Sequence, residues 1–221
     1  MRKSRLYLSL SIMSMIAAVV LGVAQGACGR GLGAVCGERS FQRNSVYAAF
    51  EARDFASMSR HAEALIADGD ALNGHRLQAY ALRGQGRLDE AIVAYHESML
   101  RESGREVPAP VLVDAYVGLA DCFNRMGLKD RARDWIDRAQ QDATDQLKQR
   151  CDDGAHYQLA CVLSVRSGIE TGETSEILRA FAIKHLQLAI EAGFDSWEHM
   201  LADLDLDPLR SEARFQALFP H

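Results

Sequence analysis

Three aspartates near the C-terminus have the spacing of the first ligands of a calcium loop. Asp203, Asp205 and Asp207 match the start of the pattern D-x-[DN]-x-[DN]-G-x5-E, in which oxygens from alternate positions hold the ion. Pro208 stands where the turn glycine belongs, and Arg214 stands where the bidentate glutamate belongs. Because the loop needs both of those residues, we expect no calcium site here.

Cysteine and histidine are the other residues that could bind a metal or act as nucleophile and base. Cys151, His156 and Cys161 are near neighbours in the sequence, but they lack the close-paired spacing of a zinc site. The sequence has no HExxH motif, no phosphate-binding loop between a strand and a helix, and no Gly-x-Ser-x-Gly elbow. We therefore predict no catalytic residue, no metal site and no cofactor, and an enzyme of unknown class is left only as a minor alternative.

Helical hairpins with small residues at fixed places account for the middle of the chain. One hairpin has large and small apolar residues on its first helix, a glycine turn, and a second helix, in the order Tyr116, Leu119, Ala120, Phe123, Gly127, Ala132, Ile136 and Ala139. The block upstream repeats this order around Gly86, with Ala79 and Ala91 as its small residues. Small residues let two helix backbones approach closely, while large ones fill the grooves between them.

Two further hairpins flank these two. Downstream, Ala160 and Ala182 are the equivalent small residues, and their wider separation predicts an enlarged turn over residues 167–176. Upstream, residues 45–52 predict the first helix of a weaker copy, and the second helix begins after a turn at Asp54. Three copies are sufficient to cover the apolar faces of a stacked array.

This pattern resembles that of tetratricopeptide (TPR) repeats, W-x2-L-G-x2-Y, then A-x3-F, then P, over about 34 residues. The stretch from Gly86 to Ala91 is the most specific match, whereas no copy has the Trp or the closing Pro at its usual place. The segment from Gly193 to Leu218 resembles the closing segment of many bacterial TPR arrays. The resemblance implies an all-α fold: a right-handed α-solenoid of about three to four TPR-like helical hairpins with a C-terminal helical cap.

The predicted domain organisation has four parts. Residues 1–26 have three basic residues before an apolar run that ends in Ala24-Gln25-Gly26, which predicts a signal peptide or, alternatively, a retained membrane anchor. Residues 27–40 are expected to form a flexible leader, residues 41–192 the repeat domain, and residues 193–221 the capping segment. In that cap, leucines and Phe215 are expected to cover the last helix face while the charged residues point outward.

The cysteines carry a second set of expectations. Cys28 is a candidate lipidation site, as in bacterial lipoproteins, although Gln25 stands where such signals carry an apolar residue. An odd count of five Cys in an exported chain leaves one thiol unpaired or modified. Cys122 with Cys161, and Cys28 with Cys36, are the pairings left open. The alternative is that Cys122 and Cys161 are small buried residues.

Composition agrees with an exported globular domain. The chain has 221 residues, of which 48% are hydrophobic and 25% are charged, and its net charge is −5. Cleavage at the predicted site would remove three basic residues and no acidic ones. An acidic chain of this kind disfavours nucleic acid and has no polybasic patch for a membrane surface. We predict a protein that is exported to the periplasm or secreted, with a candidate membrane tether only at its N-terminus.

The predicted function is protein binding. The first helices of stacked TPR hairpins line a concave groove that suits an extended segment or a helix of another protein. The expected groove residues lie opposite the packing stripe and are Arg76, Tyr80, Arg83, Asp121, Asn124 and Tyr157. We expect an adaptor or assembly factor that binds other envelope proteins or peptides. A structural component that associates with itself, through apolar residues of the end segment, is the competing prediction, and the oligomeric state stays open.

Overall fold

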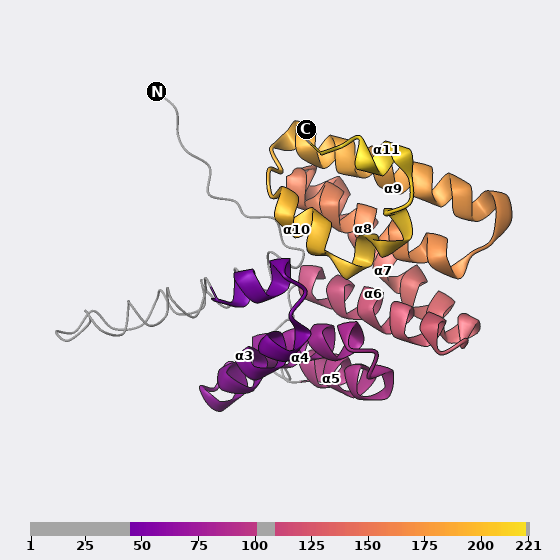
Figure 1. The fold of residues 1–221 in the computed structure, drawn as a ribbon. Coiled ribbons are helices and arrows are strands. Elements are labelled where there is room, and N and C mark those ends of the chain that lie inside the picture. The colour runs from indigo at the N-terminus through magenta and orange to yellow at the C-terminus, as the bar shows by residue number, and fades with distance from the viewer. Residues whose placement is uncertain (1–44, 101–108, 220–221) are drawn as a thin grey trace, which may run out of the picture.

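The computed structural model describes residues 45–100 and 109–219, and within these two ranges the chain is all-α and contains no strand (Figure 1). A short helix over residues 45–51 precedes ten named elements. These elements are α3 (Phe55–Ala67), α4 (Ala71–Gly84), α5 (Leu88–Leu100), α6 (Ala109–Arg125), α7 (Lys129–Arg150), α8 (Asp153–Ile169), α9 (Gly172–Ala192), α10 (Trp197–Ala202), the 3-10 helix η1 (Leu204–Leu209) and α11 (Ala213–Gln216). Consecutive helices pack as antiparallel pairs.

Aspartates begin three of the α-helices. The side chain of Asp54 accepts a hydrogen bond from the backbone N–H of Ser57 at 3.0 Å, at the start of α3. Asp70 is the N-cap of α4 and Asp152 is the N-cap of α8, where it accepts from the N–H of Ala155 at 2.9 Å. Each carboxylate satisfies a donor that the first helical turn leaves unpaired, and its charge suits the positive end of the helix.

Two glycine turns close the hairpins α4–α5 and α6–α7 in the same way. Gly86 and Gly127 have positive φ values of 77° and 79°. Glycine adopts this conformation at almost no energetic cost, because it has no Cβ. The N–H of Gly86 donates to the carbonyl of Arg83 at 3.1 Å, and the N–H of Gly127 donates to that of Asn124 at 2.9 Å. The two turns predicted from the sequence are therefore confirmed.

The small residues of the hairpins belong to one hydrophobic core. All six are fully buried, and they are Ala79, Ala91, Ala120, Ala132, Ala160 and Ala182. The pair α4–α5 packs on α6–α7, which in turn packs on α8–α9. The three first helices contact one another in the order α4, α6 and α8. The predicted pairing of helices and the predicted packing positions are confirmed.

The enlarged turn expected over residues 167–176 is wrong. The helix α8 continues to Ile169 and α9 already begins at Gly172, so that only two residues separate them. The additional residues lengthen both helices instead. The two helix ends pack on each other, because Ser167 and Ile169 of α8 and Ser175 of α9 are buried, and the hydroxyl of Ser175 donates to the carbonyl of Ser167 at 2.6 Å.

The C-terminal segment buries the apolar residues that were expected to form a cap, since Leu206, Leu209 and Phe215 are at most 2% exposed. The expectation that its charges point outward holds for Asp207 and Arg214, which are exposed, but it is wrong for Asp203 and Asp205, which are buried. The helix η1 packs on α8 and α9, and the backbone N–H of Leu204 reaches the hydroxyl of Tyr80 on α4 at 2.9 Å. The segment thus links the last pair of helices to the first part of the chain.

The predicted signal peptide, the predicted leader, Cys28 and Cys36 lie outside the described residues. Among the helices of residues 45–100 and 109–219, none has the length together with the apolar character that crossing a bilayer requires.

Candidate functional site

Four of the six predicted groove residues are buried. Arg76, Tyr80 and Arg83 occupy one face of α4, and Tyr157 is on α8. Their exposed fractions are only 0–2%. The expectation that they are exposed in an open groove is therefore wrong. Residues 203–205 of the same chain contact Tyr80, Arg83 and Tyr157, and Asp114 of α6 contacts Arg76. Whether these residues bind a partner stays a prediction.

Arg83 and Asp205 form the ion pair at the centre of this contact. The Nη2 atom of Arg83 lies 2.7 Å from Oδ1 of Asp205, and both side chains are buried. Burial raises the pKa of Asp205 above its ordinary range, and the Arg83 guanidinium opposes that effect. We describe the pair as ionised, because a guanidinium keeps its proton and a charged contact at this distance compensates for lost hydration.

Asp203 is held by hydrogen bonds from three directions. The hydroxyl of Tyr157 donates to its Oδ2 at 2.9 Å, the thiol of Cys161 lies 3.6 Å from the same oxygen, and the N–H of Asp205 donates to its Oδ1 at 3.0 Å. Burial next to this carboxylate raises the pKa of the Tyr157 hydroxyl well above its usual value, so it remains a donor.

Cys161, Asp203 and Asp205 are the one group of metal-binding atoms, within the described residues, that gather within 4.8 Å. Their donor atoms already have protein partners in Tyr157 and Arg83. The geometry therefore fits a polar contact inside the protein, and the prediction that the aspartates of this stretch bind no calcium stays a prediction.

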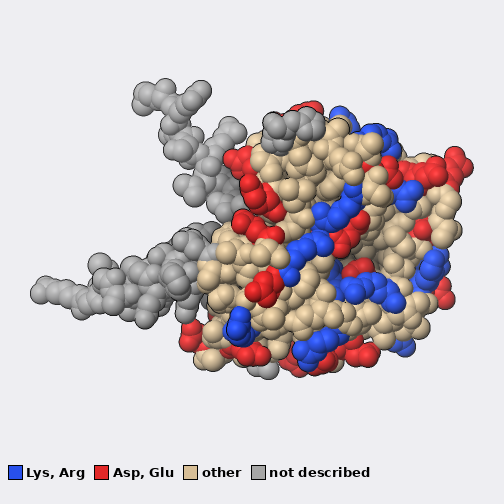
Figure 2. All heavy atoms as spheres, viewed as in Figure 1, with Lys and Arg blue, Asp and Glu red and all other residues tan. Residues whose placement is uncertain are grey.

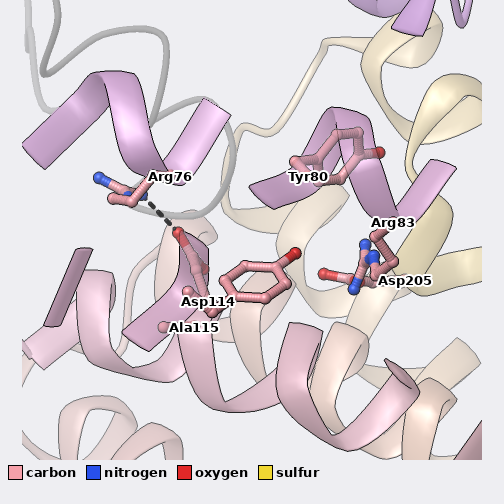
Figure 3. Close-up of a pocket in the computed structure, with 7 residues that line it drawn as sticks. Arg76, Tyr80, Arg83, Asp114, Ala115 and Asp205 are labelled. Atoms are coloured by element: carbon pink, nitrogen blue, oxygen red, sulfur yellow. Dashed lines mark hydrogen bonds and ion pairs between the residues drawn. The ribbon is translucent and has the colours of Figure 1, made fainter. Parts of the chain in front are cut away.

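A second buried pair lies at the other end of the same face of α4 (Figure 3). The Nη2 atom of Arg76 donates to Oδ2 of Asp114 at 2.7 Å, and Gln158 donates to Oδ1 of Asp114 at 3.2 Å. Burial raises the pKa of Asp114 to about 7 although Arg76 counteracts it. The cavity between the two ion pairs is about 10 Å³, which is the size needed for one water and excludes a larger ligand.

An open hollow of about 320 Å³ lies beside the C-terminal segment, a size within the range of small binding sites. It is bounded by the C-terminal ends of the three first helices and by η1, and its lining includes Asp121, Asn124, Arg125, Arg53 and Asp207. Basic and acidic side chains lie close together on this face of the molecule (Figure 2). Two of the six predicted groove residues, Asp121 and Asn124, therefore line a surface that a partner could reach.

The polar side chains of this hollow are held in place by neighbouring helices. Asn124 donates to the carbonyl of Gly168 at 3.2 Å, and Arg125 donates to the carbonyl of Arg83 at 2.9 Å. Arg125 also lies 3.7 Å from Asp121. Such contacts leave the amide oxygen of Asn124 and part of the Arg125 guanidinium for a further contact.

Sequence reasoning missed Arg53 and Asp207, which form an ion pair at the rim of the hollow. Arg53 also donates from Nε to the carbonyl of Ala202 at 3.0 Å. The alternation of Asp with Leu over residues 203–207 was the available signal, because charges that alternate with buried leucines need partners. For Arg53, which is separated from Asp207 by most of the chain, no local signal exists.

Comparison with known proteins adds no family assignment. No protein-family model matches this chain, and no significant match was found among curated proteins or among solved structures. The function therefore has to be argued from the sequence pattern and the surface of this molecule.

The described cysteines do not form the bridge considered from the sequence. Cys122 and Cys161 are both buried and both carry free thiols, whereas Cys151 is exposed. The interpretation of Cys122 and Cys161 as small buried residues is the one that the structure supports.

Proposed function

We propose that this chain is an exported TPR-like protein-protein interaction module. It acts as an adaptor or assembly factor in the bacterial envelope, and its hairpins form a right-handed α-solenoid closed by the C-terminal cap. The support for the architecture is the contact order of α4, α6 and α8, together with a fully buried alanine on each helix of the three hairpins. That arrangement is the one expected when small residues let stacked hairpins approach closely.

The observation that carries the proposed binding is the hollow at the ends of the three first helices. In this conformation the chain itself covers Tyr80, Arg83 and Tyr157, so the partner is placed at Asp121, Asn124 and neighbouring residues. The lining combines Phe55 and Pro208 with the polar groups of Asn124 and Arg125. This mixture suits an extended polypeptide segment of an envelope protein, whose backbone amides and apolar side chains both find contacts.

Crosslinking in intact cells tests this placement. A photoreactive residue introduced at Asn124 should capture a specific protein, whereas the same residue at Gln141, an exposed position of α7, should not. The captured protein is then purified, and its affinity is measured against wild type and Arg125→Glu. We expect Arg125→Glu to weaken binding about tenfold, equivalent to about 1.4 kcal/mol. Equal capture from both positions would reject the hollow as the binding site.

A self-associating structural component is the second candidate. The apolar residues of the end segment that were expected to dock a second copy are mostly buried, including Met200 and Phe215. One observation still favours this candidate: Ile177 and Phe181, one turn apart on α9, are 47% and 56% exposed. Light scattering of the purified protein over a range of concentrations separates the two functions, because a monomer at every concentration removes self-assembly.

Export belongs to the same proposal. Sequencing the N-terminus of the mature protein distinguishes cleavage before Ala27 from a retained anchor. If Cys28 is lipidated, Cys28→Ser releases the protein from the membrane fraction, whereas a wild-type protein found entirely in the soluble fraction removes the lipid tether.

A further inference from the structure

The side chains of Cys151, His156 and His185 meet where α7 ends and α8 begins. The Nε2 atom of His156 lies 4.0 Å from Sγ of Cys151, and its Nδ1 atom lies 3.0 Å from Nδ1 of His185 on α9. The three groups therefore form a chain in the order thiol, imidazole, imidazole. Neither the proposed interaction site nor the polar network under the C-terminal segment includes them.

Cys151 is placed so that reagents in solvent reach its thiol. It is exposed, whereas the other two cysteines of the described residues, Cys122 and Cys161, are buried. Cys151 ends α7 with a left-handed backbone at φ 43° and ψ 44°. Because residues with a Cβ rarely adopt this conformation, glycine or asparagine is the usual choice at such a position.

The hydrogen bond between the two histidines determines whether Nε2 of His156, the nitrogen that faces the thiol, can act as a base. Hydrogen bonding between the two Nδ1 atoms requires that one donates and the other accepts. When His156 donates from Nδ1 to His185, its Nε2 atom carries a lone pair and accepts the thiol proton. Burial lowers the pKa of both histidines below 6.5, although Asp152 opposes this effect for His156. Both rings are therefore neutral at neutral pH, as this arrangement requires.

A shared metal ion fits this geometry less well. Cys151 and His185 contact opposite nitrogens of His156, so that the three ligand atoms do not converge on one point. A nucleophile, a base and a third group that orients the base are instead the arrangement of an activated thiol. The 4.0 Å separation of sulfur and nitrogen is long, as such contacts often are before a reagent binds.

We propose that Cys151 is a site of modification by low-molecular-weight disulfides, with His156 as the general base and His185 as the residue that positions it. His156 takes the proton from Sγ, and the thiolate attacks one sulfur of the disulfide. The sulfur–sulfur bond of the reagent breaks, a mixed disulfide forms at Cys151, and the leaving thiolate takes a proton from His156. The reagent is reduced and Cys151 is oxidised, so that no further oxidant is needed.

The experiment follows the reaction of the full chain with oxidised glutathione at neutral pH. Samples are quenched by acid at intervals and digested, and mass spectrometry measures the fraction of Cys151 that carries the adduct. Because Cys161 lies in the same tryptic peptide, fragment ions must assign the adduct to one of the two cysteines. Cys151→Ser should remove the signal at this position.

The variants separate the role of His156 from an effect on folding. We expect His156→Gln to slow the reaction at Cys151 about tenfold and His185→Leu to slow it several-fold, while His185→Gln, which keeps an acceptor, should stay near wild type. His61→Gln is the matched control, because His61 is a partly buried histidine on α3 whose pKa is also lowered by burial. Circular dichroism and thermal unfolding identify any variant that has lost its fold.

Two results would overturn the proposal. One is equal reaction rates at Cys151 in wild type and in a folded His156→Gln variant. The other is a rate for folded wild type that does not exceed the rate for Cys151 in the urea-unfolded chain, since an unfolded chain retains the thiol but loses the arrangement of His156 and His185.

Discussion

Asp205 and Asp207 are two residues apart in the same segment, but they have different surroundings. The ion pair of Asp205 with Arg83 is buried on both sides, at 1% and 8% side-chain exposure. Asp207 is 43% exposed and contacts Arg53 and Arg210 at the surface. Water solvates the Asp207 pairs but not the Asp205 pair. The two carboxylates should therefore differ greatly in how much their removal lowers the free energy of unfolding.

Asp205→Ala should lower the free energy of unfolding by about 3–5 kcal/mol, because the buried Arg83 charge would lose its partner at 2.7 Å and keep only Asp121, whose Oδ2 lies 3.8 Å from Nε. Asp207→Ala is the matched control and should cost less than about 1 kcal/mol. Urea unfolding monitored by circular dichroism measures both. Similar losses for the two variants would contradict the assignment of Asp205 to a buried pair.

His199 makes the stability depend on pH. Its ring stacks on Phe50 with centroids 4.7 Å apart, and neither ring nitrogen has a hydrogen-bond partner among the described residues. Burial lowers its pKa from 6.5 to about 4, although Asp203 opposes this. The unfolded chain therefore takes up a proton between pH 6.5 and pH 4 that the folded chain does not, and stability is lost as the pH falls through that window.

His199→Phe should remove this loss, which is about 3 kcal/mol across the window. The comparison is made as a difference between wild type and variant, because Asp114, whose pKa is raised to about 7, acts in the opposite direction. Burial of a carboxyl favours its protonated form, so this group contributes less stability as the pH rises. Parallel stability curves for the two proteins between pH 7 and pH 4 would show that His199 does not titrate as expected.

At the scale of the elements, glycine determines how closely α5 and α6 approach. A Cβ added at Gly118 of α6 would lie 2.1 Å from the ring of the buried Tyr95 on α5. A glycine in a helix costs about 1 kcal/mol relative to alanine, so the close contact has to compensate for that cost. At Gly168 of α8 the same added atom would meet Pro208 at an ordinary 3.6 Å.

The two glycines give a matched pair of substitutions with opposite expected signs. Gly118→Ala should destabilise the protein by about 1–3 kcal/mol, because Tyr95 has to move within a packed core. Gly168→Ala should be neutral or should stabilise by up to about 1 kcal/mol through helix propensity. Thermal and urea unfolding of both variants provide the comparison, and a stabilised Gly118→Ala protein would disprove the close approach of α5 and α6.

At the scale of the whole molecule, two buried clusters meet at the C-terminal segment. The larger cluster extends from α4 to α11 and includes Leu206, Leu209 and Phe215. The smaller cluster contains Phe50, Met58 and Tyr80 near the start of the described chain, together with Ala202 from the C-terminal segment. The segment is therefore part of the core of the protein, and it also covers Tyr80 and Arg83 of α4 and Tyr157 of α8.

Truncation after Asp195 should prevent stable folding. It would remove four fully buried apolar side chains, Met200, Leu206, Leu209 and Phe215, which together contribute about 6–12 kcal/mol at about 1.5–3 kcal/mol each. That amount is comparable with the whole stability of a typical domain, about 5–15 kcal/mol. Leu201→Ala is the control, since Leu201 is 49% exposed and its loss should be nearly neutral. A cooperative unfolding transition in the truncated protein would contradict this account.

The helices and their pairing were predictable because they depend on local signals. Gly86 and Gly127 mark turns, aspartates begin helices, and small alanines mark the buried faces of the helices. The candidate site was predictable only in part: Asp121 and Asn124 line the hollow, whereas Tyr80 and Tyr157 are covered. Their burial depends on residues 203–207, and no periodicity of α4 or α8 indicates what a segment more than forty residues away will cover.

The sequence by itself determined that this chain is helical, that two of its hairpins turn at Gly86 and Gly127, and which small residues are buried in the hairpins. Those properties depend on side-chain size and on spacing within each hairpin. Only the tertiary structure decided that Asp203 and Asp205 of the C-terminal segment are buried. It also decided that Arg53 meets Asp207 and that Cys151 meets His156 and His185. Each of these contacts joins residues on different helices or turns, and their geometry depends on how the helical pairs are arranged in space.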